Sequence, residues 1–396
     1  MRRKSENMPN VLVLDANQRS ALAIIRSLGR RGLTVIAADA TPRPVGAASR
    51  FALKSARYSD PATSPSAFLS DISDLVERFR IDTIMPATDL TTMLLASQPN
   101  WSHSVVLATP PRESYEALTN KARLVELAKA IAIPIPMTRI ARTRIAILDA
   151  VREIKFPLVL KPARSRYLKN GKVLSTAVET ATNADQLNGI LARCQWIDDI
   201  PCLVQQFVRG HGAGVFAAYA GSGPVAWFAH RRIREKPPSG GVSVLSESVP
   251  VDSTMQAAAA KILGAVRWSG IAMVEFRVGE DGTAYLMEVN GRFWGSLQLA
   301  IDCGIDFPWL MYHIAHNREA PSMPPYPFGR RLRWLLGDLD SLLIDLRRSR
   351  MTIRQKLASI GRFLATFADF RCRQEIFRFS DPYPGLRELI QWTATL

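Results

Sequence analysis

The strongest constraint on the fold comes from residues 270–295, GIAMVEFRVGEDGTAYLMEVNGRFWG, which read as two apolar strands around a tight turn. Asp281-Gly282 favours a two-residue hairpin loop because both residues tolerate positive φ. Such a loop sets Glu275 directly opposite Glu288, with Cβ atoms about 5 Å apart. Two like charges at that distance are unfavourable unless something compensates them, so the hairpin predicts a function for its carboxylates.

A divalent cation is the simplest compensation for this pair. Side chains alternate along strands, so Asn290 shares the face of Glu275 and Glu288. Apolar neighbours predict partial burial, where two unpaired carboxylates repel and one is driven to take up a proton. Two carboxylates, an amide carbonyl, waters and a phosphate suit Mg²⁺, so we expect these side chains to hold Mg²⁺ or Mn²⁺ beside a polyphosphate. The alternative is an exposed face with ordinary salt bridges to Arg277 or Arg292.

Composition predicts a globular protein. A chain of 396 residues with 47% hydrophobic content can bury a large core and divide into several domains. The cysteines are too few and scattered for a disulfide framework, so we expect reduced thiols and a cytoplasmic location. The basic start MRRKSENMPN leads into VLVLD, whose early aspartate argues against a signal peptide. No apolar run approaches the roughly 20 residues that span a bilayer, so we expect no transmembrane segment.

The front of the chain alternates strands and helices, which predicts an α/β open-sheet domain over residues 10–112. Its first turn lacks the GxGxxG pattern, so a dinucleotide fingerprint is absent. Apolar runs predict strands at 11–15, 34–39, 81–87 and 105–108 and helices at about 19–30 and 66–80.

The middle of the chain, residues 113–316, mixes hairpins with helices and predicts an α+β domain. Asn120 suits a helix N-cap and places Lys121 in the first turn, where the helix dipole disfavours a cation. The strand PLVLKP ends in Lys161, which either points into a cleft or reaches solvent. Local violations of this kind indicate function, although a solvated lysine is the alternative at both positions.

Two further stretches of the middle domain carry expectations. A polar turn at Asn170-Gly171 should return the chain into a strand. The strand CLVQQFV, 202–208, runs into the glycine-rich stretch Gly210–Gly214, which we expect to be a flexible connection.

The remainder, 317–396, predicts a basic helical C-terminal extension with apolar stripes along 335–346 and 353–367. Residues 320–396 hold 13 Lys+Arg and 7 Asp+Glu, so 13 − 7 = +6, while the whole chain carries +16. Such a surface attracts nucleic acid, anionic lipid or a phosphorylated ligand. Nucleic acid or membrane contact through this tail is one interpretation. We favour the other, in which the stripes pack on the core or on a second subunit of a homodimer.

Five segments occur in an order and spacing that resemble the ATP-grasp superfamily, which includes biotin carboxylase, carbamoyl-phosphate synthetase and D-alanine–D-alanine ligase. They are NKARLVELAKAIAIPIP, PLVLKP, LVQQFV, GIAMVEF and LMEVNGRFWGS. The resemblance covers about 10–316 and implies a pre-ATP-grasp open-sheet domain followed by a two-lobed ATP-grasp domain. The small lobe would take about 113–208 and the large lobe about 209–316.

The resemblance also implies roles for particular residues. Lys121 and Lys161 would contact the ATP phosphates, Glu275, Glu288 and Asn290 would bind one or two Mg²⁺, and Arg292 would stabilise the anionic transition state or acyl phosphate. The backbone of the hinge strand would bind adenine, and its residues are Gln205, Gln206, Phe207 and Val208.

The chain departs from the family pattern in two places. The expected ribose-binding acid after the hinge is replaced by the Gly210–Gly214 stretch, which leaves His211 as the ribose candidate, with an ordinary loop histidine as the alternative. The phosphate-covering loop, 163–171, is basic instead of glycine-rich. In the basic run HRRIR, Arg231 and Arg232 suit a substrate carboxylate, which guanidinium groups bind in a bidentate manner.

The resemblance implies an ATP- and Mg²⁺-dependent ligase. It would activate a small-molecule carboxylate as an acyl phosphate, let an amine or related nucleophile displace the phosphate, and release ADP and phosphate. One alternative is a catalytically silent ATP-binding regulatory protein. Another is a bicarbonate-using carboxylase, which is disfavoured because the chain carries no biotinyl-lysine motif.

Overall fold

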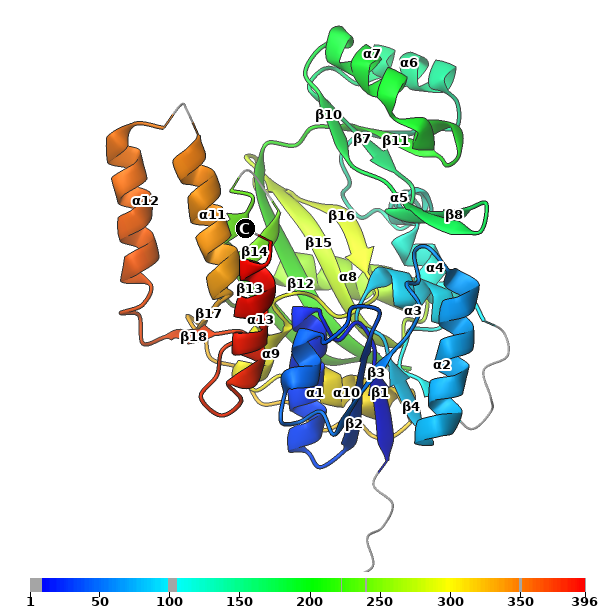
Figure 1. The fold of residues 1–396 in the computed structure, drawn as a ribbon. Coiled ribbons are helices and arrows are strands. Elements are labelled where there is room, and N and C mark those ends of the chain that lie inside the picture. The colour runs from blue at the N-terminus through cyan, green and yellow to red at the C-terminus, as the bar shows by residue number, and fades with distance from the viewer. Residues whose placement is uncertain (1–8, 99–104, 222, 239–240, 349–350, 396) are drawn as a thin grey trace, which may run out of the picture.

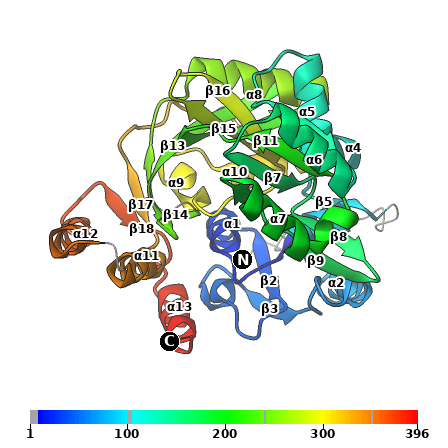
Figure 2. The same ribbon diagram turned by 90° about the horizontal axis from the view of Figure 1, so that it is seen from above.

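The strands of the described chain form three sheets and one separate hairpin, shown for a computed structural model in Figure 1. The structure describes residues 9–98, 105–221, 223–238, 241–348 and 351–395. A parallel sheet near the N-terminus and a small antiparallel sheet both lie beside one long mixed sheet, and helices cover the outer faces (Figures 1 and 2).

The N-terminal sheet is parallel and has the order β3-β2-β1-β4-β5, as the alternating pattern predicted. Each predicted strand and helix of this region is present. Strand β3 was not predicted, because its sequence KSAR contains only one apolar residue. Helix α3, which comes soon after the short strand β4, was not predicted either. The elements are β1 (Asn10–Val13), α1 (Arg19–Arg30), β2 (Thr34–Asp39), η1 (Val45–Ala48), β3 (Lys54–Arg57), α2 (Pro65–Phe79), β4 (Thr83–Met85), α3 (Asp89–Ala96) and β5 (Val106–Leu107).

The small sheet has the order β10-β7-β11-β6 with antiparallel neighbours throughout. Helices α6 and α7 cover its outer face (Figure 1), and their apolar residues share a core with β7 and β11. The predicted turn at Asn170-Gly171 is confirmed, since both residues have positive φ between β8 and β9. The elements are α4 (Arg112–Thr119), α5 (Lys121–Ala130), β6 (Thr138–Ala141), α6 (Arg144–Glu153), β7 (Leu158–Pro162), β8 (Arg166–Lys169), β9 (Lys172–Ser175), β10 (Glu179–Ala181), α7 (Ala184–Arg193), η2 (Gln195–Asp198) and β11 (Cys202–Gln206).

The long sheet has the order β16-β15-β12-β13-β14-β17-β18 and separates two hydrophobic cores. Phe216 packs with α1, α9 and α10 on one face, while its neighbour Val215 packs with α8 on the other, as strand alternation requires. The elements are β12 (Gly210–Ala220), β13 (Gly223–Lys236), β14 (Val242–Ser248), α8 (Ser253–Ala265), β15 (Gly270–Gly279), β16 (Ala284–Asn290), α9 (Leu297–Asp302), α10 (Phe307–Ala315), β17 (Arg331–Arg333) and β18 (Cys372–Gln374).

The glycine-rich stretch 210–214 is not the flexible connection that its composition predicted. It forms the first half of β12, and its residues pair in register with β15, from Gly210 opposite Gly279 to Gly214 opposite Glu275. Gly210 has φ +145°, and a Cβ there would lie 1.9 Å from the Val278 carbonyl oxygen. Close backbone approach, instead of flexibility, therefore explains this glycine.

The C-terminal region is largely helical, as predicted, and it also contributes two short strands. Its short strands β17 and β18 extend the long sheet, and the helices α11 (Leu335–Arg347), α12 (Ile353–Ala365) and α13 (Tyr383–Thr393) lie around them. The stripe along α11 is partly buried, but the stripe along α12 faces solvent, so the expected packing on the core is wrong for α12. None of the helices in the described ranges combines the length and apolar character that a bilayer crossing requires.

The two ends of the chain are tied together by a buried ion pair. The Arg26 side chain on α1 is 1% exposed, and its Nε lies 2.8 Å from Oδ2 of Asp381, which is fully buried. The guanidinium also donates to the carbonyl oxygens of Glu375 and Ile376 at 2.9 and 2.7 Å. All four cysteines are free, which agrees with the expected absence of a disulfide framework.

Candidate active site

The hairpin of β15 and β16 places its two glutamates opposite each other, as predicted, but its loop length and strand register differ from the prediction. The loop has three residues, because the Gly279 N–H donates to the Thr283 carbonyl at 2.9 Å. A register shift between Glu275 and Phe276 compensates for the extra residue. Glu275 therefore lies opposite Glu288, as predicted, and Asn290 follows on the same face.

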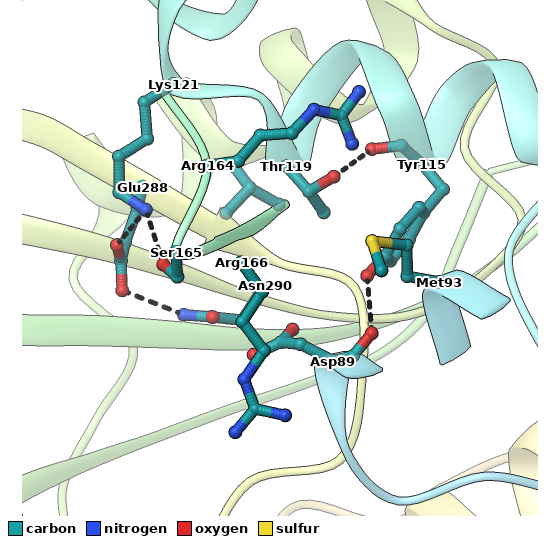
Figure 3. A pocket seen from close by; sticks show the side chains of 11 residues that line it. Asp89, Met93, Tyr115, Thr119, Lys121, Arg164, Ser165, Arg166, Glu288 and Asn290 are labelled. Atoms are coloured by element: carbon teal, nitrogen blue, oxygen red, sulfur yellow. Dashed lines mark hydrogen bonds and ion pairs between the residues drawn. The ribbon is translucent and has the colours of Figure 1, made fainter. Parts of the chain in front are cut away.

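Hydrogen bonds and ion pairs hold both carboxylates in place, and Figure 3 shows those of Glu288 with Lys121 and Asn290. Asn290 Nδ2 donates to Oε1 of Glu275 at 3.1 Å and to Oε1 of Glu288 at 3.3 Å. The remaining oxygens face cations: Lys121 Nζ lies 3.2 Å from Glu288 Oε2, and Arg232 Nη2 lies 3.4 Å from Glu275 Oε2. The face therefore holds a carboxylate pair bridged by an amide and flanked by positive charge.

The environment separates the pKa values of the two glutamates. Burial, and then the charge of Glu288, raise the pKa of Glu275 to about 7, even though Arg232 acts in the opposite direction. Burial also acts to raise the pKa of Glu288, but Lys121 and the Asn290 amide outweigh it and leave that pKa below its ordinary value. The protonation expected for one member of the pair thus falls on Glu275.

Two lysines reach this face from the small-lobe side. Asn120 caps α5 by accepting from the N–H groups of Ala122 and Arg123, as predicted, and Lys121 is 8% exposed. Lys121 also donates to Ser165 Oγ at 3.2 Å. Lys161 lies on β7, and burial, together with the nearby Lys121 charge, lowers its pKa to about 8 although Glu288 opposes the shift. An anion bound beside Lys161 would favour the charged form of this lysine and raise its pKa again.

Arg292 is positioned by a residue that the sequence analysis missed. Its Nε lies 2.9 Å from Oδ2 of Asp89, the first residue of α3 in the N-terminal sheet domain. Burial acts to lower the pKa of Arg292, but the Asp89 carboxylate outweighs it and raises that pKa. The one available signal was that Asp89 closely follows a parallel strand, where ligand-binding side chains of open sheets gather.

A pocket opens beside these groups, and Figure 3 shows the side chains that point into it. Its walls come from α3, from α4 and α5, from the loop containing Arg164, Ser165 and Arg166, and from Glu288 to Asn290 on β16. The basic loop predicted to cover a phosphate therefore lies across the pocket from the carboxylate pair. Both lobes and the N-terminal domain contribute to one site.

The structure separates the two arginines that were assigned to a substrate carboxylate. Arg232 joins the site because Gly212 and Gly214 on β12 place no side chain between it and Glu275. Arg231, the next residue on β13, points to the opposite face by strand alternation. There it forms ion pairs with Glu247, so its predicted position at the site is wrong.

His211 is also absent from the cluster. It lies opposite Val278, on the same side of the sheet as the buried Phe276, and therefore on the opposite side from Glu275. Its side chain is exposed. The glycine-rich stretch forms a strand, and this fixes the orientation of the His211 side chain. The sequence had predicted a flexible connection there.

The strand predicted as the hinge connects the small sheet to the long sheet. β11 is a central strand of the small sheet and runs through Phe207 and Val208 into β12 of the long sheet. Gln205 is buried and donates from Nε2 to Thr138 Oγ1 at 2.9 Å, while Gln206 is exposed and Phe207 is 37% exposed. The Val208 carbonyl accepts from Arg277 Nε at 3.2 Å, which ties the hinge to β15.

The donor set fits a metal that is shared with a phosphate. Among the described residues no cluster of three or more His, Cys, Asp or Glu side chains exists to enclose a metal alone. The two carboxylates match Mg²⁺, which binds one or two carboxylates together with phosphates and waters. The Asn290 amide directs Nδ2 at both carboxylates here and its oxygen toward Arg292 at 3.4 Å, so it would have to turn over to serve as a metal ligand. The raised pKa of Glu275 reflects its burial and its repulsion by Glu288, and such a cation would remove that repulsion.

Solved structures with the same fold cover most of the chain. A biotin carboxylase–ATP complex from Campylobacter jejuni has a TM-score of 0.64 with 16% identity and covers 82% of this chain and 74% of its own. The biotin carboxylase domain of a Hydrogenobacter thermophilus 2-oxoglutarate carboxylase, a dimer in complex with MgADP, ADP and bicarbonate, gives 0.60 with 16% identity and covers 81% and 73%. This chain has the ATP-grasp fold.

Other comparisons agree with this fold. An L-amino acid ligase from Bacillus licheniformis has a TM-score of 0.58 with 15% identity and covers 79% of this chain and 75% of its own. Residues 201–337 match the family model described as "ATP-grasp in the biosynthetic pathway with Ter operon". An uncharacterized protein, y4rH, from Sinorhizobium fredii (strain NBRC 101917 / NGR234) is 28% identical over 211 residues, which is 52% of this chain but only 42% of that relative.

Proposed function

We propose that the protein is an ADP-forming ligase that activates a small-molecule carboxylate with ATP and Mg²⁺ for attack by an amine or related nucleophile. The observation that carries this proposal is the opposition of Glu275 and Glu288 at a pocket rimmed by cations. A carboxylate pair held this close is costly without a ligand, which indicates that the site is organised for a metal-bound polyphosphate.

ATP would lie between the lobes. The hinge backbone at 205–208 would contact the adenine, and Lys121 and Lys161 would hold the phosphates. Lys121 would move from Glu288 to the nucleotide, since both are anionic and the metal would take over the carboxylate. Bound Mg²⁺, held by Glu275, Glu288 and Asn290, would supply the positive charge that neutralises the transferring phosphoryl group.

The substrate carboxylate would lie between Arg292 and Arg232. Its oxygen would attack the γ-phosphorus while the bond to the bridging oxygen of ADP breaks, which forms an acyl phosphate. The nucleophile would then attack the carbonyl carbon, and inorganic phosphate would leave. Asp89 keeps the Arg292 guanidinium turned toward this point, and prearranged positive charge lowers the barrier where negative charge develops.

The complete cationic rim supports turnover over a purely regulatory role. A nucleotide-sensing protein has no need for Arg292 to be fixed by a carboxylate from a separate domain. The biotin carboxylase domain with bicarbonate and the L-amino acid ligase share the fold, so both bicarbonate and amino acids belong among the candidate substrates.

The test is ADP production with ATP and Mg²⁺ across pools of carboxylates, bicarbonate included, with and without amines. We expect ADP release that depends on both an acid and a nucleophile and that is lost in Glu288→Gln. Tight ATP binding without turnover in any pool would overturn the proposal and favour a regulatory protein.

A further inference from the structure

The outer face of α12 is an apolar stripe that the fold does not use. Ile353 is 77% exposed, Leu357 is 61% exposed and Leu364 is 57% exposed. We call Ile353, Leu357 and Leu364 the α12 stripe. Beyond the helix Phe370 is 91% exposed, whereas the ring of Phe367 packs 4.3 Å from the buried Arg333 guanidinium. Contiguous exposed apolar side chains of this kind mark interaction surfaces on proteins.

The inner face of α12 provides the packing that holds the helix. Ser359 and Thr366 are buried, and Phe363 lies against the guanidinium of Arg333 at 4.2 Å. Thr366 Oγ1 accepts from Arg234 at 3.0 Å. Figures 1 and 2 show α12 at the periphery, with α11 between it and the rest of the molecule. The α12 stripe therefore points away from the protein and adds nothing to its core.

Positive charge flanks the stripe on both sides. The helix sequence IRQKLASIGRFLA contains three cations and no acidic residue. With about 100° between successive residues, Arg354 falls on one side of the line from Ile353 to Leu364 and Lys356 falls on the other. Neither cation forms an ion pair with a carboxylate in the described part of the chain, although many other surface cations do. The partner must therefore be apolar and anionic at once.

We propose that the α12 stripe docks the protein on an anionic lipid bilayer surface. An amphipathic helix with an aliphatic face and basic flanks lies in the interfacial plane, where its apolar side chains enter the acyl boundary and its cations meet lipid phosphates.

The charge pattern argues against the other occupants. A symmetric contact with a second copy would set the same patch against itself and oppose Arg354 and Lys356 with the same two cations. Nucleic acid would satisfy the cations, but the aliphatic side chains of Ile353, Leu357 and Leu364 have no partner on a phosphate backbone.

Docking through α12 leaves the active site accessible. The carboxylate pair lies on β15 and β16 at one edge of the long sheet, whereas α12 lies beyond β17 and β18 at the other edge. A bilayer on this side would therefore hold the enzyme without covering the pocket. This proposal is independent of the reaction that the site performs.

The test is cosedimentation of the full chain with phosphatidylcholine vesicles and with phosphatidylcholine–phosphatidylserine vesicles, at low and high salt. We expect binding to the anionic vesicles only, weakened by salt. Leu357→Ser/Leu364→Ser should reduce the partition coefficient about tenfold or more, because two apolar anchors are lost. Arg354→Gln/Lys356→Gln should reduce it about 25-fold, at roughly fivefold for each charge.

Two matched controls carry the same kinds of change elsewhere. Ile145→Ser/Leu148→Ser alters exposed apolar residues on α6, which are 73% and 46% exposed, and Arg78→Gln/Lys155→Gln removes exposed charges from other elements. Both should bind like the parent protein. Because all the changed side chains are exposed or lie at the surface, unfolding does not confound the comparison, and circular dichroism verifies this.

Three results would overturn the proposal. The first is an absence of vesicle binding. The second is binding that the α12 variants and the controls retain equally, which would assign it to the general basic surface. The third is a concentration-dependent dimer in sedimentation velocity that disappears in Leu357→Ser/Leu364→Ser while vesicles are not bound, which would make the stripe a subunit interface.

Discussion

Two ion clusters lie toward opposite edges of the same long sheet, and they differ in whether a carboxylate faces only cations or also another carboxylate. Near β17, Asp338 accepts from Arg234 at 2.7 and 2.6 Å and from Arg333 at 2.7 Å, and the Arg333 guanidinium also lies over the rings of Phe363 and Phe367. Near β16, Glu275 and Glu288 face each other, and the pKa of Glu275 rises to about 7.

This difference indicates a structural role for the Asp338 cluster and a ligand-binding role for the Glu275–Glu288 cluster. In the Asp338 cluster the carboxylate meets two guanidinium groups of the protein, and Nη1 of Arg333 is its one buried nitrogen without a hydrogen-bond partner among the described residues. The Glu275–Glu288 cluster carries a charge conflict in the free protein, which a bound cation and polyphosphate would relieve. A site that is unfavourable alone and favourable with its ligand binds that ligand at the expense of stability.

The largest effect on stability should come from removing the carboxylate of the Asp338 cluster. Asp338→Ala leaves two arginines without their carboxylate, one of them fully buried, and should lower the free energy of unfolding by about 3 to 5 kcal/mol. Asp345→Ala, on the exposed side of the same helix, removes only a surface pair with Arg348 and should cost less than about 1 kcal/mol. Urea denaturation measures both. Equal effects would show that burial of Asp338 carries no special weight.

The next effect concerns activity alone. Arg292→Lys keeps the charge but loses the planar fork and its contact with Asp89, so turnover should fall about 100-fold while ATP binding changes little. Arg193→Lys, in a surface pair with Glu179, serves as the control and should leave turnover unchanged. Steady-state ADP production and ATP titration provide the measurements. Full turnover in Arg292→Lys would remove this residue from the mechanism.

A smaller effect should appear in stability against pH. The pKa of Glu275 lies near 7 in the folded protein and near the ordinary 4.5 in the unfolded chain, so the folded state binds this proton more tightly. Stability of the ligand-free protein should therefore fall as pH rises from about 4.5 and reach its full loss above about 7. Glu275→Gln should remove that loss and stabilise the protein by about 2 kcal/mol above pH 7.

The control for this measurement is Glu280→Gln, in the exposed loop of the same hairpin. It should leave the pH profile unchanged. If thermal unfolding shows identical profiles for the parent and Glu275→Gln, then the carboxylate pair is not in conflict and the contrast with the Asp338 cluster is lost.

The smallest effect should be on nucleotide affinity. Burial lowers the pKa of Lys161 to about 8, so this side chain loses its charge as pH rises above that value. ATP affinity should weaken by up to about tenfold per pH unit there, because the phosphates lose a cationic partner. Lys161→Arg keeps its charge and should show a flat profile in isothermal titration. A flat profile in the parent protein would place Lys161 away from the phosphates.

The sequence predicted much of this arrangement because alternation along strands is a robust signal. A strand has only two faces, so Glu275, Glu288 and Asn290 fall together whenever both strands exist, even though the loop is one residue longer than expected. The same rule, applied to Arg231 and His211, would have separated them from the site. Their strands were not extended far enough in the prediction.

Other features depended on contacts between distant segments, which periodicity does not report. Asp89 reaches Arg292 only because the N-terminal sheet packs beside the large lobe. β17 and β18 have three residues each and depend on pairing with the long sheet, so they have no pattern of their own. The exposed stripe on α12 has the same periodicity as a core-facing helix, and only the structure shows which way it points.

The ion pair between Arg26 and Asp381 has a consequence for biosynthesis. The first helix emerges from the ribosome more than three hundred residues before its buried carboxylate partner is made, and domains fold in order as they are synthesised. Until that late segment arrives, the guanidinium of Arg26 has to stay hydrated. The earliest part of the protein therefore completes its packing last.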